Sequence, residues 1–233
     1  MPPVLQLINV RKRFQSPRPL RVNDLSVDGG ERVALSGFDA AAAEVLVNLV
    51  TGASIPDEGE VRVLGNPTAA ISDGDEWLAS LDRFGIVTSR AVLLDAATLL
   101  QNLAMPMTLA IDPMPPEIAA ASTRLAREVG IEDRWLPQPM VALPGAVRAR
   151  AHLARAVALD PVLLILEHPT VGLAPADGTP FGRTLARLAA ARGLAALIIS
   201  EDEAFSAAAA TRRLVLQPAS GDLRARRRRF FGL

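Results

Sequence analysis

An unbroken apolar run at residues 162–166 (VLLIL) constrains the fold of this chain more than any other feature. Consecutive aliphatic residues are typical of an inner strand of a parallel sheet, because such a strand is buried on both faces. Strand-like and helix-like segments alternate around it, which predicts an α/β protein with a parallel sheet. Residues 4–10 and 60–64 predict an antiparallel pair. The other expected strands are residues 32–36, 84–88, 194–200 and 213–217, and the expected helices are residues 40–51, 181–191 and 202–210.

A helical segment interrupts the sheet-forming sequence. Residues 89–155 carry helical patterns broken by proline-rich joints at residues 113–116 (PMPP) and 137–139 (PQP). At 233 residues the chain is long enough for one sizeable domain with its own hydrophobic core. We therefore expect a single domain in three parts, which are a core of residues 1–88 and 156–223, a helical arm of residues 89–155 and a basic tail of residues 224–233.

Composition excludes several classes of function. Lys+Arg and Asp+Glu both number 25, so no excess of positive charge favours nucleic acid as a partner. The chain has no cysteine and only two histidines, His152 and His168, so we expect neither a thiolate nor a histidine-rich metal site. No apolar run approaches the roughly 18 residues that span a bilayer. The N-terminus also lacks a signal-peptide pattern, and we expect a cytoplasmic protein.

The end of the chain carries a cluster of basic residues, which are Arg224, Arg226, Arg227, Arg228 and Arg229. A run of like charges at a terminus is usually a solvated, mobile segment. Contact with anionic lipid headgroups at a membrane surface is the alternative. Both interpretations stay open at this point.

Two consecutive segments, residues 153–161 (LARAVALDP) and 163–173 (LLILEHPTVGL), resemble the ATP-binding-cassette (ABC) ATPase family. In that family they form the helix after the signature motif, the Walker B strand and the D-loop. Residues 9–14 (NVRKRF) resemble the opening strand, with Phe14 at the position of the aromatic that stacks on adenine; ordinary packing is the alternative for Phe14. The resemblance covers nearly the whole chain. It implies a P-loop NTPase-like parallel sheet with an antiparallel β edge and an inserted α-helical subdomain.

The phosphate-binding loop of this family reads G-x-x-x-x-G-K-[ST], because phosphate needs a nest of N–H groups, a lysine and a hydroxyl for Mg²⁺. Here residues 37–44 read GFDAAAAE, so that only Gly37 matches. Ala42 replaces the second glycine, Ala43 the lysine and Glu44 the hydroxyl. A carboxylate about 4 Å from a phosphate charge adds a repulsion of about 4 kcal/mol at an effective dielectric of about 20. Since about 1.4 kcal/mol is a factor of ten, we expect Mg·ATP binding to be weakened by several orders of magnitude.

Asp39 precedes four alanines that favour helix and is a preferred N-cap residue. Its carboxylate is expected on the exposed N–H groups of a helix that begins at Ala40, where phosphate would otherwise bind. We interpret Asp39 as an internal substitute for the anion, although a plain N-cap predicts the same geometry.

The Q-loop and the signature motif are altered as well. The glutamine of the Q-loop falls at Ser89 in the segment IVTSR. The signature L-S-G-G-Q reads LPGAV at residues 143–147, which retains Leu143 and Gly145. Pro144 removes both the serine hydroxyl and a backbone donor.

The positions that would act on the γ-phosphate differ from the family pattern too. The Mg²⁺-binding aspartate of Walker B is Glu167, the catalytic glutamate is His168 and the switch histidine is Glu201. A neutral histidine can accept a proton, but only with a triphosphate in place. Glu167 and His168 therefore stand at catalytic positions without an assigned catalytic role.

These replacements predict an ABC transporter subunit that does not hydrolyse ATP and acts as a structural or regulatory partner of an active ATPase or of membrane permease subunits. It would work as a homodimer or heterodimer at the inner face of a membrane, with no cofactor unless the altered site still binds Mg·ATP. Two alternatives stay open, an ABC ATPase with an altered but working site and a soluble scaffold without a transporter. The basic tail resembles that of Mla/MCE-type lipid-transport ATPases, and residues 100–106 resemble the lipoprotein-releasing and cell-division branches.

Overall fold

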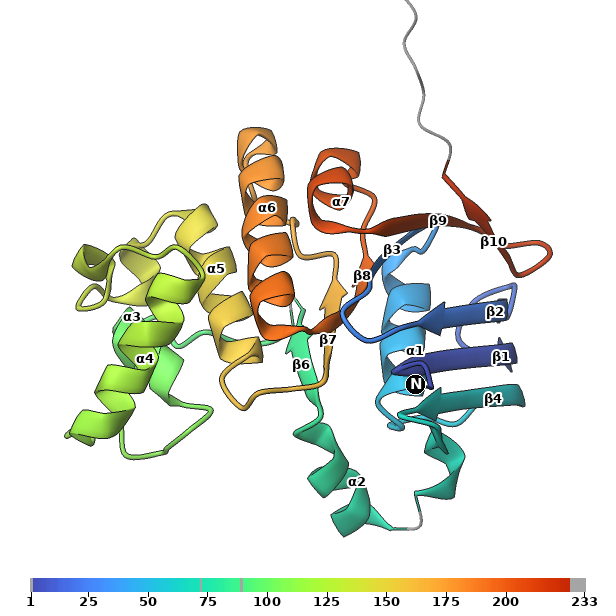
Figure 1. Cartoon of the computed structure of the whole chain (residues 1–233), viewed down its shortest axis with the longest axis horizontal. Coiled ribbons are helices and arrows are strands. Elements are labelled where there is room, and N and C mark those ends of the chain that lie inside the picture. Colours follow the sequence, from blue (N-terminus) through green and yellow to red (C-terminus); the bar gives the residue numbers. More distant parts are fainter. Residues whose placement is uncertain (1, 72, 89, 227–233) are drawn as a thin grey trace, which may run out of the picture.

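A six-stranded sheet forms the centre of the computed structural model, which describes residues 2–71, 73–88 and 90–226 (Figure 1). The strand order is β10-β9-β3-β8-β7-β6, with β10 antiparallel to β9 and all other pairs parallel. The strands are β3 (Arg32–Ser36), β6 (Phe84–Val87), β7 (Leu163–Glu167), β8 (Ala195–Ile199), β9 (Arg212–Gln217) and β10 (Asp222–Ala225). Every residue of β7 and β8 is buried, which confirms the inner parallel strand expected at residues 162–166.

A second, antiparallel sheet has the order β2-β1-β4-β5. Its strands are β1 (Leu5–Lys12), β2 (Leu20–Val27), β4 (Glu58–Val63) and β5 (Asn66–Pro67). Leu5 lies opposite Val63 and Leu7 opposite Val61, so the expected antiparallel pair is confirmed. These side chains are buried in one hydrophobic core with the inner face of α1 (Ala40–Val50), which packs against strands of both sheets.

Helices cover the opposite face of the six-stranded sheet (Figure 1). There α6 (Pro175–Arg192) packs against α7 (Glu203–Ala209), and the rings of Phe181 and Phe205 stack at 5.5 Å. On the side of β6 lie α3 (Leu99–Ala104), α4 (Pro116–Glu128) and α5 (Gly145–Ala156). Within the described ranges, no helix is long and apolar enough to cross a membrane. The remaining helices are α2 (Gly74–Leu81), η1 (Thr68–Ala70), η2 (Asp133–Trp135) and η3 (Met140–Ala142).

The predicted α/β fold is confirmed, but sequence analysis missed β2, β5, η1, α2 and β10. β2 contains Asn23 and Asp24, residue types that are depleted in strands, yet it pairs with β1 along most of its length. α2 begins with Gly74, a poor helix former, and has no fully buried residue, so that its apolar residues Trp77 and Leu81 give only a short stripe in the sequence. The division into core, arm and tail at the stated boundaries stays a prediction.

The described part of the chain extends into the expected basic tail of residues 224–233. The first two of these residues belong to β10, and the Arg226 guanidinium donates to the Ser36 hydroxyl at 3.1 Å. The first residues of this segment are therefore held by strand pairing. A charge pattern in the sequence does not reveal such pairing. Residues 227–233 lie outside the described residues.

Gly85 lets the end of α5 pack directly on β6. A Cβ atom at this position would lie 2.2 Å from the carbonyl oxygen of Ala156 and 2.6 Å from Cδ2 of Leu164. Both distances are far below van der Waals contact, and one of the two atoms belongs to the backbone. Any side chain at position 85 therefore forces α5 away from the sheet.

We expect Gly85→Ala to lower the free energy of unfolding by about 3 kcal/mol, the upper end of the cost of overpacking, because backbone has to move. Gly74→Ala is the matched control, since a Cβ atom there meets nothing within 4 Å. Urea unfolding followed by tryptophan fluorescence measures both variants. Equal stability of the two would contradict a tight contact between β6 and α5.

Candidate functional site

The loops that follow β3, β6, β7 and β8 meet at one edge of the six-stranded sheet, because parallel strands place their carboxyl ends side by side. Ligands of open α/β proteins bind at this edge. The loop after β3 begins with Gly37, and β6, β7 and β8 lead into Thr88, His168 and Ser200. The altered phosphate-binding loop, the Walker B strand and the switch position therefore come together here.

Asp39 caps the helix that follows the loop. Helix α1 begins at Ala40, and Asp39 Oδ1 accepts a hydrogen bond from the Ala42 N–H at 2.7 Å. The N-cap geometry expected from the sequence is thus confirmed. Ala43, at the lysine position, is fully buried in the core beneath this first turn. The interpretation of Asp39 as a substitute for an anion stays a prediction.

Glu201 reaches back from the end of β8 to the loop after β3. Its Oε1 atom accepts hydrogen bonds from the N–H groups of Gly37 at 2.6 Å and Phe38 at 3.3 Å. Gly37 has a φ of +89°, a conformation that favours glycine and helps consecutive N–H groups to face one acceptor. Two carboxylates of the chain, Glu201 and Asp39, therefore lie on N–H groups where the sequence resemblance implies phosphate.

Arg90 joins two acidic side chains that come from different elements. Its guanidinium lies 2.8 Å from Oε2 of Glu44 on α1 and 2.6 Å from Oε2 of Glu167 at the end of β7. The Thr88 hydroxyl donates to the same Glu167 oxygen at 2.9 Å. The Glu167 side chain is only 8% exposed, whereas that of Glu44 is 52% exposed. Because an unpaired buried charge is costly, Glu167 is the carboxylate that most needs this cation.

Sequence analysis missed Arg90, although it had a signal for it. Two carboxylates, Glu44 and Glu167, stand at positions that contact one Mg²⁺ ion in the ABC family, and the lysine between them is lost. An arginine in the adjoining loop is then the expected counter-ion, since its planar guanidinium can bind two carboxylates at once. The expected Q-loop position, Ser89, lies outside the described residues.

We call Glu44, Arg90 and Glu167 the ion cluster. The two histidines lie near each other and outside this cluster. Both line a cavity of about 290 Å³ between α5 and the loop after β7. The backbone N–H of His168 donates to the Ile199 carbonyl at 2.8 Å, and the φ of His168 is +44°. His168 Nε2 is buried, and in the described part of the chain it has no hydrogen-bond partner.

The remaining predicted residues lie elsewhere. Phe14 is half-buried and packs against the core between the two sheets, which agrees with its ordinary packing interpretation. Leu143 is buried in the core beneath α3–α5, and Gly145 begins α5 directly after Pro144.

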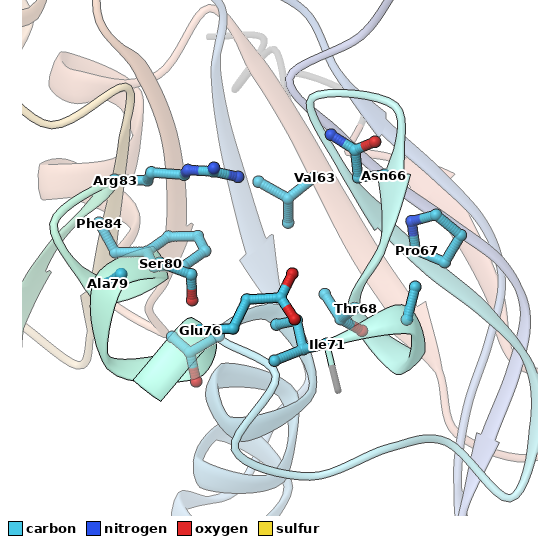
Figure 2. Close-up of a pocket in the computed structure, with 12 residues that line it drawn as sticks. Val63, Asn66, Pro67, Thr68, Ile71, Glu76, Ala79, Ser80, Arg83 and Phe84 are labelled. Carbon is cyan, nitrogen blue, oxygen red and sulfur yellow. The ribbon is translucent and has the colours of Figure 1, made fainter. Parts of the chain in front are cut away.

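A separate cavity of about 390 Å³ lies between β4, η1 and α2 (Figure 2). Val63, Ile71 and Phe84 give it apolar walls, while Glu76 and Arg83 lie at its sides. Its lining includes no member of the ion cluster. The ion cluster at the sheet edge is therefore separate from this cavity.

Comparison with known proteins also indicates the ABC transporter family. The profile of the ABC transporter family matches residues 20–171, more than half of the chain. The lipoprotein-releasing system ATP-binding protein LolD of Alcanivorax borkumensis is 28% identical over 209 residues, which cover 88% of this chain and 91% of LolD. The methionine import ATP-binding protein MetN of Brucella abortus is 28% identical over 200 residues, which cover 86% of this chain but only 53% of MetN.

Solved structures agree in fold. The structure of cbiO1 from Clostridium perfringens, part of the ABC transporter complex cbiONQ, has a TM-score of 0.79 and 19% identity, covering 96% of this chain and 88% of that one. The dimeric ATP-binding cassette MJ0796, solved in a post-hydrolysis state with ADP and Pi, has a TM-score of 0.76 and 21% identity, covering 97% and 100%. At these identities the likeness shows the fold alone.

His152 gives the region beside the site a dependence on pH. Burial, followed by the charges of Arg155 and Arg148, lowers the pKa of His152 from 6.5 to about 4. The folded chain therefore binds this proton more weakly than the unfolded chain does. The resulting stability is complete above about pH 6.5 and is lost as the pH falls toward about 4.

We expect wild-type protein to lose about 1–2 kcal/mol more stability than His152→Gln between about pH 7 and pH 4.5, after allowance for the partial exposure of the ring. Urea unfolding of both proteins across this range measures the difference. Carboxylates contribute to both curves alike, so they cancel. Parallel pH profiles would show that the imidazole is not kept neutral by its surroundings.

Proposed function

Because this chain belongs to the ABC transporter family as an ATP-binding subunit, we propose that it serves a transporter without hydrolysing ATP. One observation carries the proposal, which is that the chain's own side chains occupy the candidate nucleotide site. Glu201 lies on the N–H groups of the loop after β3, and Arg90 lies between Glu44 and Glu167.

A magnesium-bound triphosphate does not fit this set of residues. Its oxygens would have to displace Glu201 from the Gly37 N–H, and the two like charges repel at such a distance. Mg²⁺ would have to displace the Arg90 guanidinium from Glu167. The lysine that would offset these costs is replaced by the buried Ala43. No catalytic step is therefore assigned to this site.

The proposal extends to partners. LolD and MetN are both named as ATP-binding proteins of transport systems, and MJ0796 is dimeric in its solved structure. We propose that this chain pairs with a second ATP-binding subunit, identical or different, and with membrane permease subunits at the inner face of a membrane. The two relatives are named for different cargoes, so the proposal names no cargo for this chain.

We expect titration calorimetry of the purified chain with Mg·ATP to give no dissociation constant in the micromolar range, since both the N–H groups and Glu167 already have partners. ATP without magnesium and Mg·ADP are the companion titrations. A micromolar constant for Mg·ATP would contradict the proposal and would make Glu44 and Glu167 candidate Mg²⁺ ligands.

Repair of the phosphate-binding loop is expected to restore binding only. Ala42→Gly, Ala43→Lys and Glu44→Ser supply the glycine, the cation and the hydroxyl, and Glu201→Gln in addition removes the competing charge. We expect the quadruple variant to bind Mg·ATP at least ten-fold more tightly than the triple variant. This factor corresponds to a difference of about 1.4 kcal/mol in the free energy of binding. Equal affinities would show that Glu201 does not compete with nucleotide.

Hydrolysis is expected from neither repaired variant. General-base help is worth roughly 10²–10⁴-fold, and the position of the family's catalytic glutamate holds His168. Phosphate release is measured on protein freed from contaminating ATPase, with the unrepaired chain as the control. Turnover by the triple variant would show that His168 acts as a base, and the non-hydrolysing role would then be wrong.

A further inference from the structure

Between β6, which ends at Val87, and α3, which begins at Leu99, lies a segment that includes residues 90–95, which we call the connection. Its first residue, Arg90, is bound to the sheet side of the molecule through Glu44 on α1 and Glu167 on β7. The backbone N–H of Arg90 also donates to the Thr88 hydroxyl at 3.3 Å, and this hydroxyl itself donates to Glu167. The connection is therefore fastened to the core at its beginning.

Two arginines of α5 hold the other end of the connection. The Arg155 guanidinium donates to the Val92 carbonyl at 2.7 Å. Arg148 pairs with Asp95 at 2.9 Å. A continuous chain of polar contacts thus runs from β7 and α1, through Arg90 and residues 92–95, to α5.

We propose that Arg90 is an internal lock, which fixes the helices α3–α5 relative to the six-stranded sheet without any ligand. The inference rests on the proposed function, since Arg90 keeps both carboxylates only while no metal ion competes for them. A nucleotide-binding site would join these loops through the nucleotide and its metal. In this chain the Arg90 side chain, which belongs to the connection, joins the loops instead.

The strength of the lock comes mainly from Glu167. Its carboxylate is almost completely buried, so removal of the cation leaves an uncompensated charge. The pair with Glu44 is half-exposed and contributes less, because water and salt screen it. The planar guanidinium contacts both acids at once, which fixes the direction of the connection as well as its position.

Amide hydrogen exchange of Arg90→Met tests the lock. We expect residues 91–98 to exchange at least ten-fold faster than in the wild type, while β3 and β8 keep their protection. Arg62→Met is the matched control, because Arg62 pairs with Glu60 and its side chain has the same 41% exposure as that of Arg90. This control is expected to leave residues 91–98 unchanged.

A second variant separates the lock from overall stability. Arg90→Met combined with Glu167→Gln removes the unpaired buried charge, so its unfolding midpoint is expected to lie closer to the wild-type value than that of Arg90→Met. Fast exchange of residues 91–98 is expected to persist, because the connection is still detached from the core. Wild-type exchange rates there, or an equal increase throughout the chain, would overturn the inference.

The same experiment with Mg·ATP distinguishes this inference from the proposed function. We expect nucleotide to leave the exchange of the wild-type chain unchanged. Protection of the loop after β3 by Mg·ATP would count against the proposed function alone, while the comparison of Arg90→Met with Arg62→Met, made without nucleotide, would still decide for or against the lock.

Discussion

The buried carboxylate of Glu167 is the charge on which the arrangement of the site depends. It ends β7, a strand buried along its whole length, so water does little to compensate it. A cation has to come close, and in this chain the cation is the Arg90 guanidinium from the loop after the neighbouring strand. Because that cation is covalently part of the connection to α3, the pair also holds this connection against the sheet.

Several hydrogen-bonding groups at this sheet edge are paired within the chain. The N–H groups of Gly37 and Phe38 share the Glu201 carboxylate, the Ala42 N–H has Asp39, and Glu167 has Arg90 and Thr88. Buried polar groups are nearly always satisfied in folded proteins, and here the partners are side chains. His168 Nε2 is an exception within the described ranges, and His168 lines the cavity beside α5.

Local patterns in the sequence predicted what local chemistry decides. The aliphatic run before Glu167 predicted β7, and Asp39 before a row of alanines predicted the first turn of α1. The partners across the site were not predicted, because Glu201 and Gly37 are 164 residues apart and Arg90 and Glu167 are 77 apart; only Arg90 had a signal in the sequence, the two carboxylates without their lysine. Such contacts follow from the order of strands in the sheet, which residue types alone do not specify. β2 was missed for a related reason, since pairing with β1 outweighs the low strand preference of Asn23 and Asp24.

The replacements at the family-motif positions are best understood together, because the charge changed at one position affects the charge needed at another. Loss of the lysine at Ala43 removes a positive charge from the loop, and Glu44 adds a negative one nearby. Arg90 offsets this change, because it binds Glu44 and Glu167 together. Without a phosphate, the exposed Gly37 N–H would be left to water, and the glutamate at the switch position supplies an acceptor from within the chain. Glu44, Glu167 and Glu201 thus all have partners within the chain, and agreement of this kind between separate positions is typical of a sequence that specifies one structure. A chain that had lost its motifs independently would leave some of these charges unpaired at the sheet edge.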